Sequence, residues 1–401
     1  MFRLAYFVSH PIQYQAPLLR LIDSDPEIDL TVFFYSDFSL HSYKDKGFGR
    51  TVKWDIPLTE GYKHEFLKCW GSCQWRGWLR QPIATNVMSA LEQGNFDAVW
   101  VHGWSWLCSL QAIFSANRLQ VPVLLRGEAN GFSESSNLFK EKAKRTILSW
   151  LFKKISLFLP IGTLNYQFYR SYNIKPESLQ LVPYAVDNDY FSTQADLAKQ
   201  KRENLRRSLG LEPNRPIILY ASKLIGRKRP QDLLNAYQHL LCRADSDTKP
   251  YLLFVGDGDM KPSLELAVSS SNEDSVRFLG FRNQSELPAF YDLCDVFVLP
   301  SSFEPWGLVI NEVMNAGKAV VVSDKIGCLH DLIEDGVNGR IFPVGDISAL
   351  SKALDWALQN SASAGVASLS KIGEWSYQED VQGIKKALLS LSKAGDKWNE
   401  Y

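Results

Sequence analysis

The stretch SSFEPWGLVINEVMNAG, Ser301–Gly317, decides how the chain is organised. It follows the apolar run Val296–Leu299, which predicts a buried parallel strand. From Trp306 onward apolar residues recur at helical spacing, so a turn and then a helix should follow the strand. Glu304 is therefore predicted in the turn at the carboxyl end of the strand, and Glu312 in the helix. Open α/β sheets bind ligands at such turns, so the stretch predicts a ligand site.

Strands and helices alternate on both sides of this stretch, which predicts an α/β chain with parallel, doubly wound sheets. At 401 residues the chain is too long for one ordinary domain, and two are expected. The polar, highly charged segment Ser192–Arg215 separates the two halves, so we place the boundary near Tyr190. The expected strands are Leu4–Val8, Leu30–Phe34, Ala98–Val101, Val121–Leu125, Leu157–Ile161 and Leu179–Val182, then Ile217–Tyr220, Tyr251–Val255, Val276–Leu279, Val296–Leu299 and Ala319–Val322.

Composition describes a globular enzyme that functions in the cytoplasm. Hydrophobic residues make up 45% of the chain, and the 44 basic and 44 acidic side chains balance, so no nucleic-acid partner is expected. Neither a signal peptide nor an apolar run of membrane-spanning length is visible. The six cysteines are scattered, as free thiols in a reducing compartment would be. Cys69 and Cys73 lack the second pair of ligands that a zinc site needs.

Two further turns carry residues that suit a phosphate ligand. Lys223 and Lys228 follow the expected strand Ile217–Tyr220, where two cations would neutralise a diphosphate and the charge that develops on it. Gly256 and Gly258 form a Gly-Asp-Gly turn after the next strand. The alternative for the first turn is a solvated basic loop, and for the second an ordinary connection between a strand and a helix.

Glu304 and Glu312, with seven residues between them and preceded by the Lys223–Lys228 turn, resemble the donor-site signature of retaining, family-four (group 1) glycosyltransferases with the GT-B fold. The resemblance implies two tandem Rossmann-like domains with a cleft between them. Residues 1–190 would form an acceptor-binding domain and residues 191–372 a domain that binds the nucleotide-sugar donor. Residues 373–401 would form a helix that crosses back to the first domain.

The resemblance also implies roles for individual residues. Glu304 would contact the transferred sugar near its anomeric side, and Glu312 would accept hydrogen bonds from the ribose hydroxyls. Family members usually have Gly-Arg where this chain has Ser222-Lys223, and Lys keeps the charge of Arg but loses its bidentate fork. The other implied contacts are to the phosphates from Lys223, Lys228 and the backbone amides of Trp306, Gly307, Leu308 and Val309, and to the nucleotide from Gly256, Gly258 and the turn at Phe281.

In the first half, His102 ends an expected strand and should face the ligand side. Two functional roles are open for it, a hydrogen bond to a donor sugar hydroxyl or the positioning of the acceptor, besides a purely structural one. Glu128 follows the next strand and is a second candidate for an acceptor contact. The first βα turn lacks the glycines that many relatives have there, so His10, Gln13 and Tyr14 are candidates for lining the acceptor side.

The expected function is transfer of a sugar, of hexosyl type, from a nucleotide-diphosphate sugar to a glycan or lipid-linked acceptor, with retention of configuration. Glu304, His102, Lys223 and Lys228 are the residues expected to act in catalysis. No Asp-x-Asp signature follows a strand, so we expect neither a metal nor a cofactor. Two alternatives are a nucleotide-sugar epimerase of the same fold and a catalytically silent sugar-binding scaffold.

Two surface segments complete the predictions. Leu138–Lys154 has six basic and one acidic side chain among apolar residues, so it could lie on an anionic bilayer at the inner membrane face. A packed helix with a basic outer face is the alternative. Eight of the 12 tryptophans precede residue 151, either as core residues or as stacking surfaces for sugars. Ser361–Ser370 is rich in Ser and Ala and is expected to be a loop.

Overall fold

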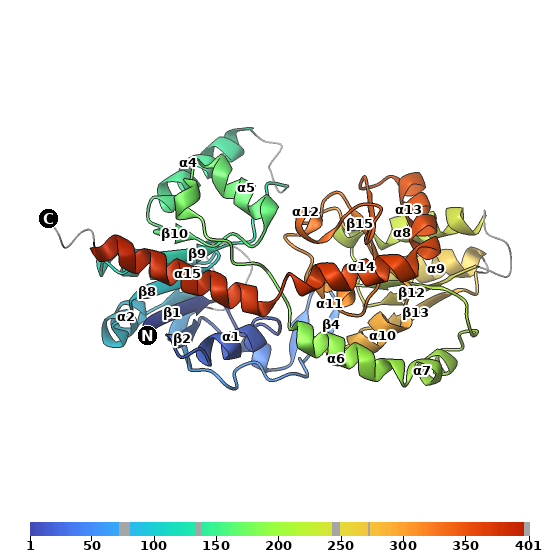
Figure 1. Ribbon diagram of the computed structural model, residues 1–401, viewed down its shortest axis with the longest axis horizontal. Helices are drawn as coiled ribbons and strands as arrows, with labels where there is room; N and C mark the ends of the chain where they lie inside the picture. The colour runs from blue at the N-terminus through green and yellow to red at the C-terminus, as the bar shows by residue number, and fades with distance from the viewer. Residues whose placement is uncertain (72–80, 133–137, 243–248, 272, 397–401) are drawn as a thin grey trace. The chain divides into compact units, whose positions relative to one another are not determined.

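The computed structural model describes residues 1–71, 81–132, 138–242, 249–271 and 273–396 (Figure 1). The chain folds into two units. Unit 1 comprises Met1–Tyr43, Ile56–Tyr184 and Tyr377–Tyr401, and unit 2 comprises Lys44–Asp55 and Ala185–Ser376. The chain therefore passes from one unit to the other four times, at residues 43/44, 55/56, 184/185 and 376/377.

Unit 1 contains a six-stranded parallel sheet in the order β10-β9-β8-β1-β2-β5. The chain builds the sheet outward from β1 in one direction and then returns to β8, on the other side of β1. The order of the strands thus reverses between β1 and β8, and the turns that follow these two strands diverge there. The strands are β1 (Phe2–Val8), β2 (Ile28–Phe34), β5 (His64–Phe66), β8 (Ala98–His102), β9 (Val123–Arg126) and β10 (Leu157–Phe158).

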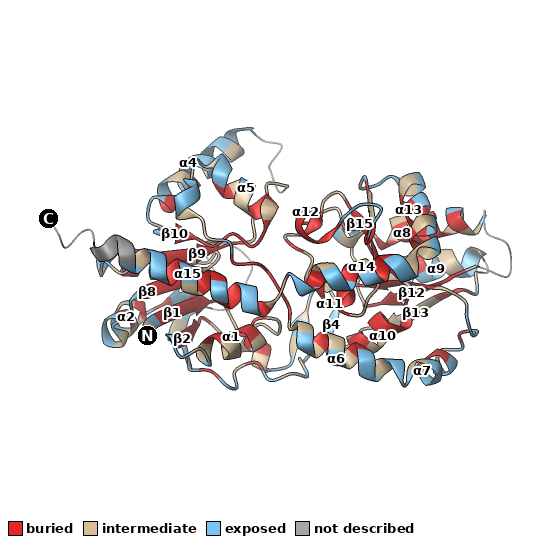
Figure 2. Ribbon diagram, in the orientation of Figure 1, coloured by how far each residue is buried: buried red, intermediate tan, exposed pale blue. Residues whose placement is uncertain are grey.

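Helices cover both faces of this sheet because successive strand residues point to opposite sides. Ala5 and Phe7 of β1 pack into a buried cluster with residues of α2, α3 and α4. Helices α1 and α15 contribute no residue to that cluster and contact each other. Figure 2 shows buried and exposed residues alternating along α15, as expected for a helix that packs on one side. The helices are α1 (Ala16–Asp23), α2 (Val87–Gly94), α3 (Leu107–Arg118), α4 (Leu138–Phe152), α5 (Thr163–Ser171) and α15 (Tyr377–Asp396), and a small antiparallel sheet joins β6 (Cys69–Trp70) to β7 (Ile83–Ala84).

Unit 2 repeats the same strand order in a second six-stranded parallel sheet, β13-β12-β11-β14-β15-β16, so the order reverses between β11 and β14. Its strands are β11 (Ile217–Ala221), β12 (Tyr251–Val255), β13 (Val276–Gly280), β14 (Val296–Leu299), β15 (Ala319–Ser323) and β16 (Gly339–Phe342). Its helices are α6 (Asn188–Lys199), α7 (Arg202–Ser208), α8 (Pro230–Leu241), α9 (Lys261–Ser271), α10 (Leu287–Leu293), α11 (Leu308–Met314), α12 (Leu329–Leu332), α13 (Ile347–Gln359) and α14 (Ser361–Gly373).

Three local predictions differ from the structure. The expected strand at residues 179–182 is reduced to an isolated bridge between Leu179 and Phe158. The serine-rich segment expected to be a loop is helix α14, because Ser368 donates to the Lys318 carbonyl oxygen at 2.8 Å and Gly365 packs directly on the backbone of Gly317. The helix expected from Trp306 begins two residues later, at Leu308, after a glycine in the left-handed region.

The units also differ from the expected domains in two places. The chain changes units at residues 184/185 rather than near Tyr190, because α6 packs on α10 of unit 2 and its first turn is capped by the Asp187 carboxylate, which accepts from the Tyr190 N–H at 2.9 Å. Residues 44–55 lie within the range expected for the first domain, but they belong to unit 2, where β3 (Tyr43–Asp45) and β4 (Arg50–Val52) pair as a hairpin that the sequence analysis did not predict.

Candidate functional site

The turns that follow β11 and β14 meet at the point where the strand order of unit 2 reverses. Lys228 and Glu304 form an ion pair there, with 13% and 8% of their side chains exposed. Arg227 adds a second, more exposed cation, whose Nη1 lies 3.7 Å from the other Glu304 oxygen. Burial lowers the pKa of Lys228, and the negative charge of Glu304 opposes that shift. The site thus holds a buried carboxylate between two cations.

Lys223 lies in the same turn but does not contact Glu304. Its ammonium nitrogen lies 2.9 Å and 3.0 Å from the two carboxylate oxygens of Asp45, in the hairpin segment 44–55. Both lysines expected to neutralise a phosphate are therefore already paired with a carboxylate. Sequence reasoning gave no sign of Asp45, because 178 residues separate it from Lys223.

Gly256 and Gly258 allow the turn after β12 to pack against the turn after β11. A Cβ atom at Gly256 would lie 1.9 Å from the Ser222 carbonyl oxygen, and one at Gly258 would lie 2.3 Å from that of Leu224. Both glycines also have positive φ angles, of 139° and 159°. The two glycines are thus required by the backbone, and they support the turn that carries Lys223.

Glu312 lies within α11, where its Oε2 accepts a hydrogen bond from the Tyr291 hydroxyl at 2.6 Å. Burial raises the pKa of Glu312 to about 7. The carboxyl group therefore exchanges its proton near neutral pH, while one oxygen remains available for another donor. Phe281, the residue expected on the base side, directly follows β13 and is partly exposed.

Around the start of α11, side chains and backbone have separate roles. The Trp306 side chain is 2% exposed, donates from Nε1 to Asn311 Oδ1 at 2.9 Å and stacks on Trp375. It is a core residue, so only its backbone is left for the phosphate contact that the sequence predicted. Gly307 has a φ of 104°, which favours glycine, and Leu308 and Val309 are partly exposed in the first turn of the helix.

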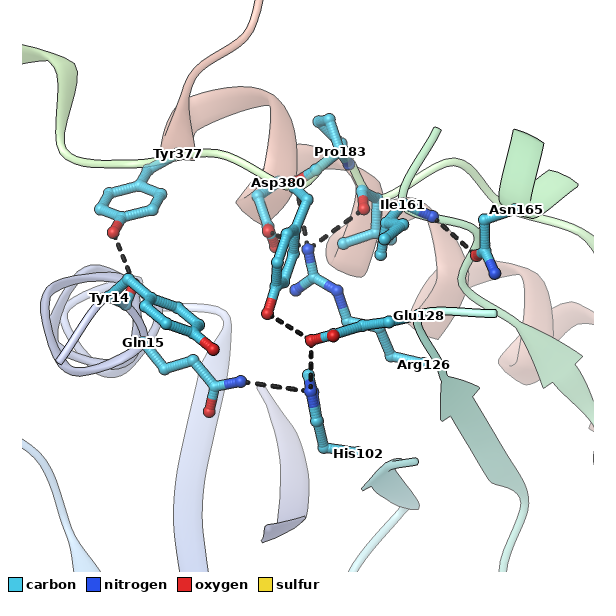
Figure 3. A network of polar contacts seen from close by, with 12 residues as sticks. Tyr14, Gln15, His102, Arg126, Glu128, Ile161, Asn165, Pro183, Tyr377 and Asp380 are labelled. Atoms are coloured by element: carbon cyan, nitrogen blue, oxygen red, sulfur yellow. Dashed lines mark hydrogen bonds and ion pairs between the residues drawn. The ribbon is translucent and has the colours of Figure 1, made fainter. Parts of the chain in front are cut away.

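Unit 1 has its own polar group at the point where its strand order reverses. His102 is the last residue of β8, and its Nε2 lies 3.5 Å from Glu128 Oε1 (Figure 3). Gln15 reaches the same imidazole from the turn after β1, with its Nε2 3.4 Å from the ring nitrogens. Tyr184 donates its hydroxyl to Glu128 Oε1 at 2.6 Å. Burial opposes ionisation of Glu128, but His102 and the Tyr184 hydroxyl hold the pKa of Glu128 below its ordinary value.

A cavity of about 320 Å³ opens beside His102 and Glu128, and every residue that lines it belongs to unit 1. Trp104 and Trp106 supply its aromatic walls, whereas Trp100 is a fully buried core residue. The remaining lining residues are Ser9, Gly103, Ser105, Gly127 and Ala129. His10, a candidate for the acceptor side, packs against Phe38 and lies 2.8 Å through its Nδ1 from the Ser9 hydroxyl, and burial lowers the pKa of His10 to about 4.

Behind this group, a buried ion pair holds the last helix against the sheet. Arg126, at the end of β9, donates to Asp380 Oδ2 of α15 at 2.8 Å and to the carbonyl oxygens of Val182 and Pro183 (Figure 3). Arg126 is 2% exposed and Asp380 is fully buried. The pair joins the end of β9 to α15, and no pattern in the sequence indicated it, because 254 positions separate the two residues.

Within the described ranges, no group of three or more His, Cys, Asp or Glu side chains has an arrangement that could hold a metal ion. In the same ranges, none of the helices has both the length and the apolar character needed to span a membrane. Neither finding decides between the functions considered above.

Residues 201–375 match the sequence model of the family "Glycosyl transferases group 1". We call residues 201–375 the group 1 segment. An uncharacterized glycosyltransferase of Methanocaldococcus jannaschii is 37% identical over 145 residues, which is 36% of each chain. The alpha-D-kanosaminyltransferase of Streptomyces kanamyceticus is 29% identical over 197 residues, 49% of this chain and 47% of that protein. The chain thus spans about a third to a half of the length of these two relatives.

The fold extends the likeness beyond the group 1 segment. The crystal structure of Alr3699/HepE from Anabaena in complex with UDP has a TM-score of 0.72 and 17% identity, covering 97% of this chain and 100% of that one. The fold is GT-B, with two Rossmann-like units. The group 1 segment contains Lys223, Lys228, Glu304 and Glu312, which the sequence analysis expected at a donor site, whereas His102, Glu128 and Asp45 lie outside it.

Proposed function

We propose that this protein transfers a hexosyl group from a nucleotide-diphosphate sugar to a glycan or lipid-linked acceptor, with retention of anomeric configuration. The observation that carries the proposal is the buried Lys228–Glu304 pair, which lies in the group 1 segment where the strand order of unit 2 reverses. The complex of HepE with UDP supports a nucleotide as part of the donor.

In this proposal, unit 2 binds the donor and stabilises its leaving group. The bond from the anomeric carbon to the diphosphate oxygen breaks, the acceptor hydroxyl bonds to that carbon, and the hydroxyl proton passes to the departing diphosphate. Lys228 and Lys223 neutralise the charge that grows on the diphosphate, and the Glu304 carboxylate stabilises the positive charge on the sugar. Glu312 accepts hydrogen bonds from the ribose hydroxyls.

Unit 1 binds the acceptor in the cavity beside His102 and Glu128. A polar wall with two adjacent indoles suits a sugar, because hydroxyl groups bond to the wall while the apolar ring face stacks on Trp104 or Trp106. His102 orients an acceptor hydroxyl in this proposal. The second candidate role of His102 is a contact with the donor sugar. Kinetics of a His102 variant distinguish the two roles, because a changed KM for the acceptor indicates the first and a changed KM for the donor indicates the second.

Neither a metal nor a cofactor takes part in the proposed reaction, since Lys223, Lys228 and backbone N–H groups supply the positive charge. Addition of EDTA should therefore leave the rate of transfer unchanged. Loss of activity in EDTA that returns with Mg²⁺ or Mn²⁺ would contradict this part of the proposal.

The proposed function is tested by incubating the protein with UDP-, GDP- and ADP-sugars, with and without a panel of glycan acceptors. Release of nucleoside diphosphate that increases with acceptor, together with a product of retained configuration by NMR, is the expected result. Interconversion of the sugar nucleotide without release would indicate an epimerase. Binding without any turnover, on a panel that includes lipid-linked acceptors, would indicate a scaffold.

A peripheral contact with an anionic bilayer at the inner membrane face, for a protein located in the cytoplasm, completes the proposal. Helix α4 exposes large apolar side chains next to its lysines: Phe139 is 86%, Ile147 63% and Trp150 55% exposed. The Trp150 ring also lies against Phe114 of α3, with 5.6 Å between the ring centroids and the planes tilted by 43°, which widens the apolar surface. Basic and apolar side chains on one surface favour an interface with anionic lipid.

Vesicle sedimentation tests this contact. The protein should pellet with vesicles that contain anionic lipid, and salt should release it. Replacing Lys140, Lys142, Lys153 and Lys154 with Gln should abolish pelleting. A control variant that replaces four lysines of other helices with Gln, Lys352, Lys371, Lys385 and Lys386, should still pellet. A parent protein that stays in the supernatant would favour a helix whose basic face is only solvated.

A further inference from the structure

The hairpin segment 44–55 contacts both turns of unit 2 to which the donor nucleotide is assigned. On the base side, the Phe48 ring lies edge-on against Phe281, with 4.8 Å between the ring centroids, and the Arg50 guanidinium lies 5.1 Å from the centroid of the same ring. Two further bonds fix the hairpin to the loop after β13, from Asn283 to the Lys53 carbonyl oxygen and from Ser285 to Asp55.

On the phosphate side, the turn of the hairpin encloses the Lys223 ammonium group. Asp45 binds it with both carboxylate oxygens, and the Phe48 ring centroid lies 4.6 Å from the same nitrogen. Gly47 is so close that a Cβ atom there would lie 2.6 Å from Lys223 Cδ. Three residues of one turn thus occupy the space around the cation that a phosphate would use.

Asp45 is held in place for this contact. Its Oδ1 accepts hydrogen bonds from the backbone N–H groups of Gly47 at 2.8 Å and Phe48 at 2.9 Å. Burial opposes ionisation, but the hydrogen bonds from Lys223 and from these N–H groups hold the pKa of Asp45 below its ordinary value. The carboxylate is therefore ionised at neutral pH, and its position does not depend on Lys223 alone.

We propose that Asp45 is a built-in counter-ion of the donor site, which the diphosphate of the donor replaces on Lys223 and which returns when the nucleoside diphosphate leaves. This inference rests on the proposed function, since it assumes that unit 2 binds a nucleoside diphosphate. The product carries more negative charge than the donor and would bind Lys223 more tightly. A competing carboxylate of fixed position weakens that binding and favours release of the product.

Replacing Asp45 with Asn tests the exchange. Asparagine keeps an oxygen that can accept the Gly47 and Phe48 N–H groups but removes the charge. In titration calorimetry with UDP, GDP and ADP, we expect Asp45→Asn to bind the nucleotide preferred by the parent protein about three- to tenfold more tightly. The corresponding nucleoside, which has no phosphate to compete for Lys223, should bind both proteins equally.

Two controls separate the exchange from a structural effect. Asp55→Asn removes one charge from the same segment and keeps an oxygen that can accept the Ser285 hydrogen bond, and it leaves the Asp45–Lys223 contact intact, so the affinity for nucleoside diphosphate should not rise. On a Lys223→Ala background, Asp45→Asn should no longer raise the affinity, because the group through which it acts is gone. Thermal unfolding of each variant shows that the hairpin change has not unfolded the protein.

Unchanged or weaker diphosphate binding by a folded Asp45→Asn protein would overturn the inference. An equal gain in affinity without Lys223 would overturn it too, since the effect would then be one of general charge. A parent protein that binds none of the three nucleoside diphosphates gives a different result, because it refutes the proposed function and the inference together.

Discussion

The two units have the same strand order, yet the groups they place at the reversal point differ. In unit 1 the turns after β1 and β8 bring together Gln15, His102 and Glu128 beside an aromatic cavity. In unit 2 the turns after β11 and β14 bring together Lys228 and Glu304, nearly buried. Strand order therefore decides where a site forms, and the turn residues decide its chemistry. A Lys pair suits an anion that gains charge, whereas His and Glu suit hydroxyl groups.

The largest effect is expected from Glu304→Gln, which keeps the shape of the side chain and removes the charge. If Glu304 stabilises positive charge on the sugar, kcat should fall by about a hundredfold or more while the donor KM changes little. Steady-state kinetics on a variant with a normal unfolding transition measures this. Turnover of the variant at the parent rate would show that Glu304 does not act on the reacting sugar. The main difference proposed between the two units would then be wrong.

The next largest effect is expected from Lys228→Ala. The change removes a charge-assisted contact worth on the order of 1.5–3 kcal/mol, so nucleoside diphosphate should bind about ten- to a hundredfold more weakly. The variant also leaves the buried Glu304 carboxylate without this partner, which should lower the unfolding temperature. Lys371→Ala, on the exposed side of α14, is the matched control and should change neither quantity. Equal affinities for parent and Lys228→Ala proteins would place the phosphates elsewhere.

Unit 1 should respond in the opposite way. His102→Asn and Glu128→Gln should each lower the rate of transfer about tenfold through poorer positioning of the acceptor, while calorimetry shows unchanged binding of nucleoside diphosphate. That combination would sharpen the division of labour between the units. A loss of nucleotide affinity in either variant would instead assign His102 to the donor.

The smallest effect concerns pH. Since burial raises the pKa of Glu312 to about 7, from an ordinary value of 4.5, the folded protein carries this group protonated and neutral below pH 7. Ribose binding by the carboxylate should therefore strengthen a few-fold as the pH rises through about 7. Without ligand, the same group stabilises the fold most at low pH, and that contribution is lost as the pH rises from about 4.5 to 7. Calorimetry between pH 5.5 and 8.5 should show the slope in the parent and a flat profile in Glu312→Gln.

Local patterns in the sequence were enough to predict two doubly wound, parallel α/β domains and to place Lys223, Lys228 and Glu304 in turns after strands, whereas the GT-B fold was implied by the family resemblance. Each residue lies in the turn that follows an apolar run, and parallel strands bring their carboxyl ends to one edge. The residues that the sequence did not reveal all depend on distant partners. Asp45 reaches Lys223 across 178 residues, and Tyr291 reaches Glu312 from another helix. The periodicity of apolar residues along the sequence does not predict contacts between such distant residues.

The same reason explains the errors in local structure. The segment at α14 has the composition of a loop, but its small residues allow close contact with Gly317 and Lys318, and that packing stabilises the helix. Trp306 carried a functional expectation because of its neighbours. That expectation concerned the backbone amide of Trp306 and stays a prediction, since the core position of the indole, stacked on Trp375 and bonded to Asn311, does not bear on it.

The buried Arg126–Asp380 pair has a consequence for the order in which the protein can be made. The two residues are 254 positions apart, so a ribosome finishes nearly the whole chain before Asp380 exists. Until then the Arg126 guanidinium lacks the Asp380 carboxylate as its partner. A buried charge without its partner destabilises the fold by several kcal/mol. Unit 1 is the first to begin and the last to be completed, and a gene truncated before α15 should yield an insoluble or rapidly degraded product even though unit 2 is whole.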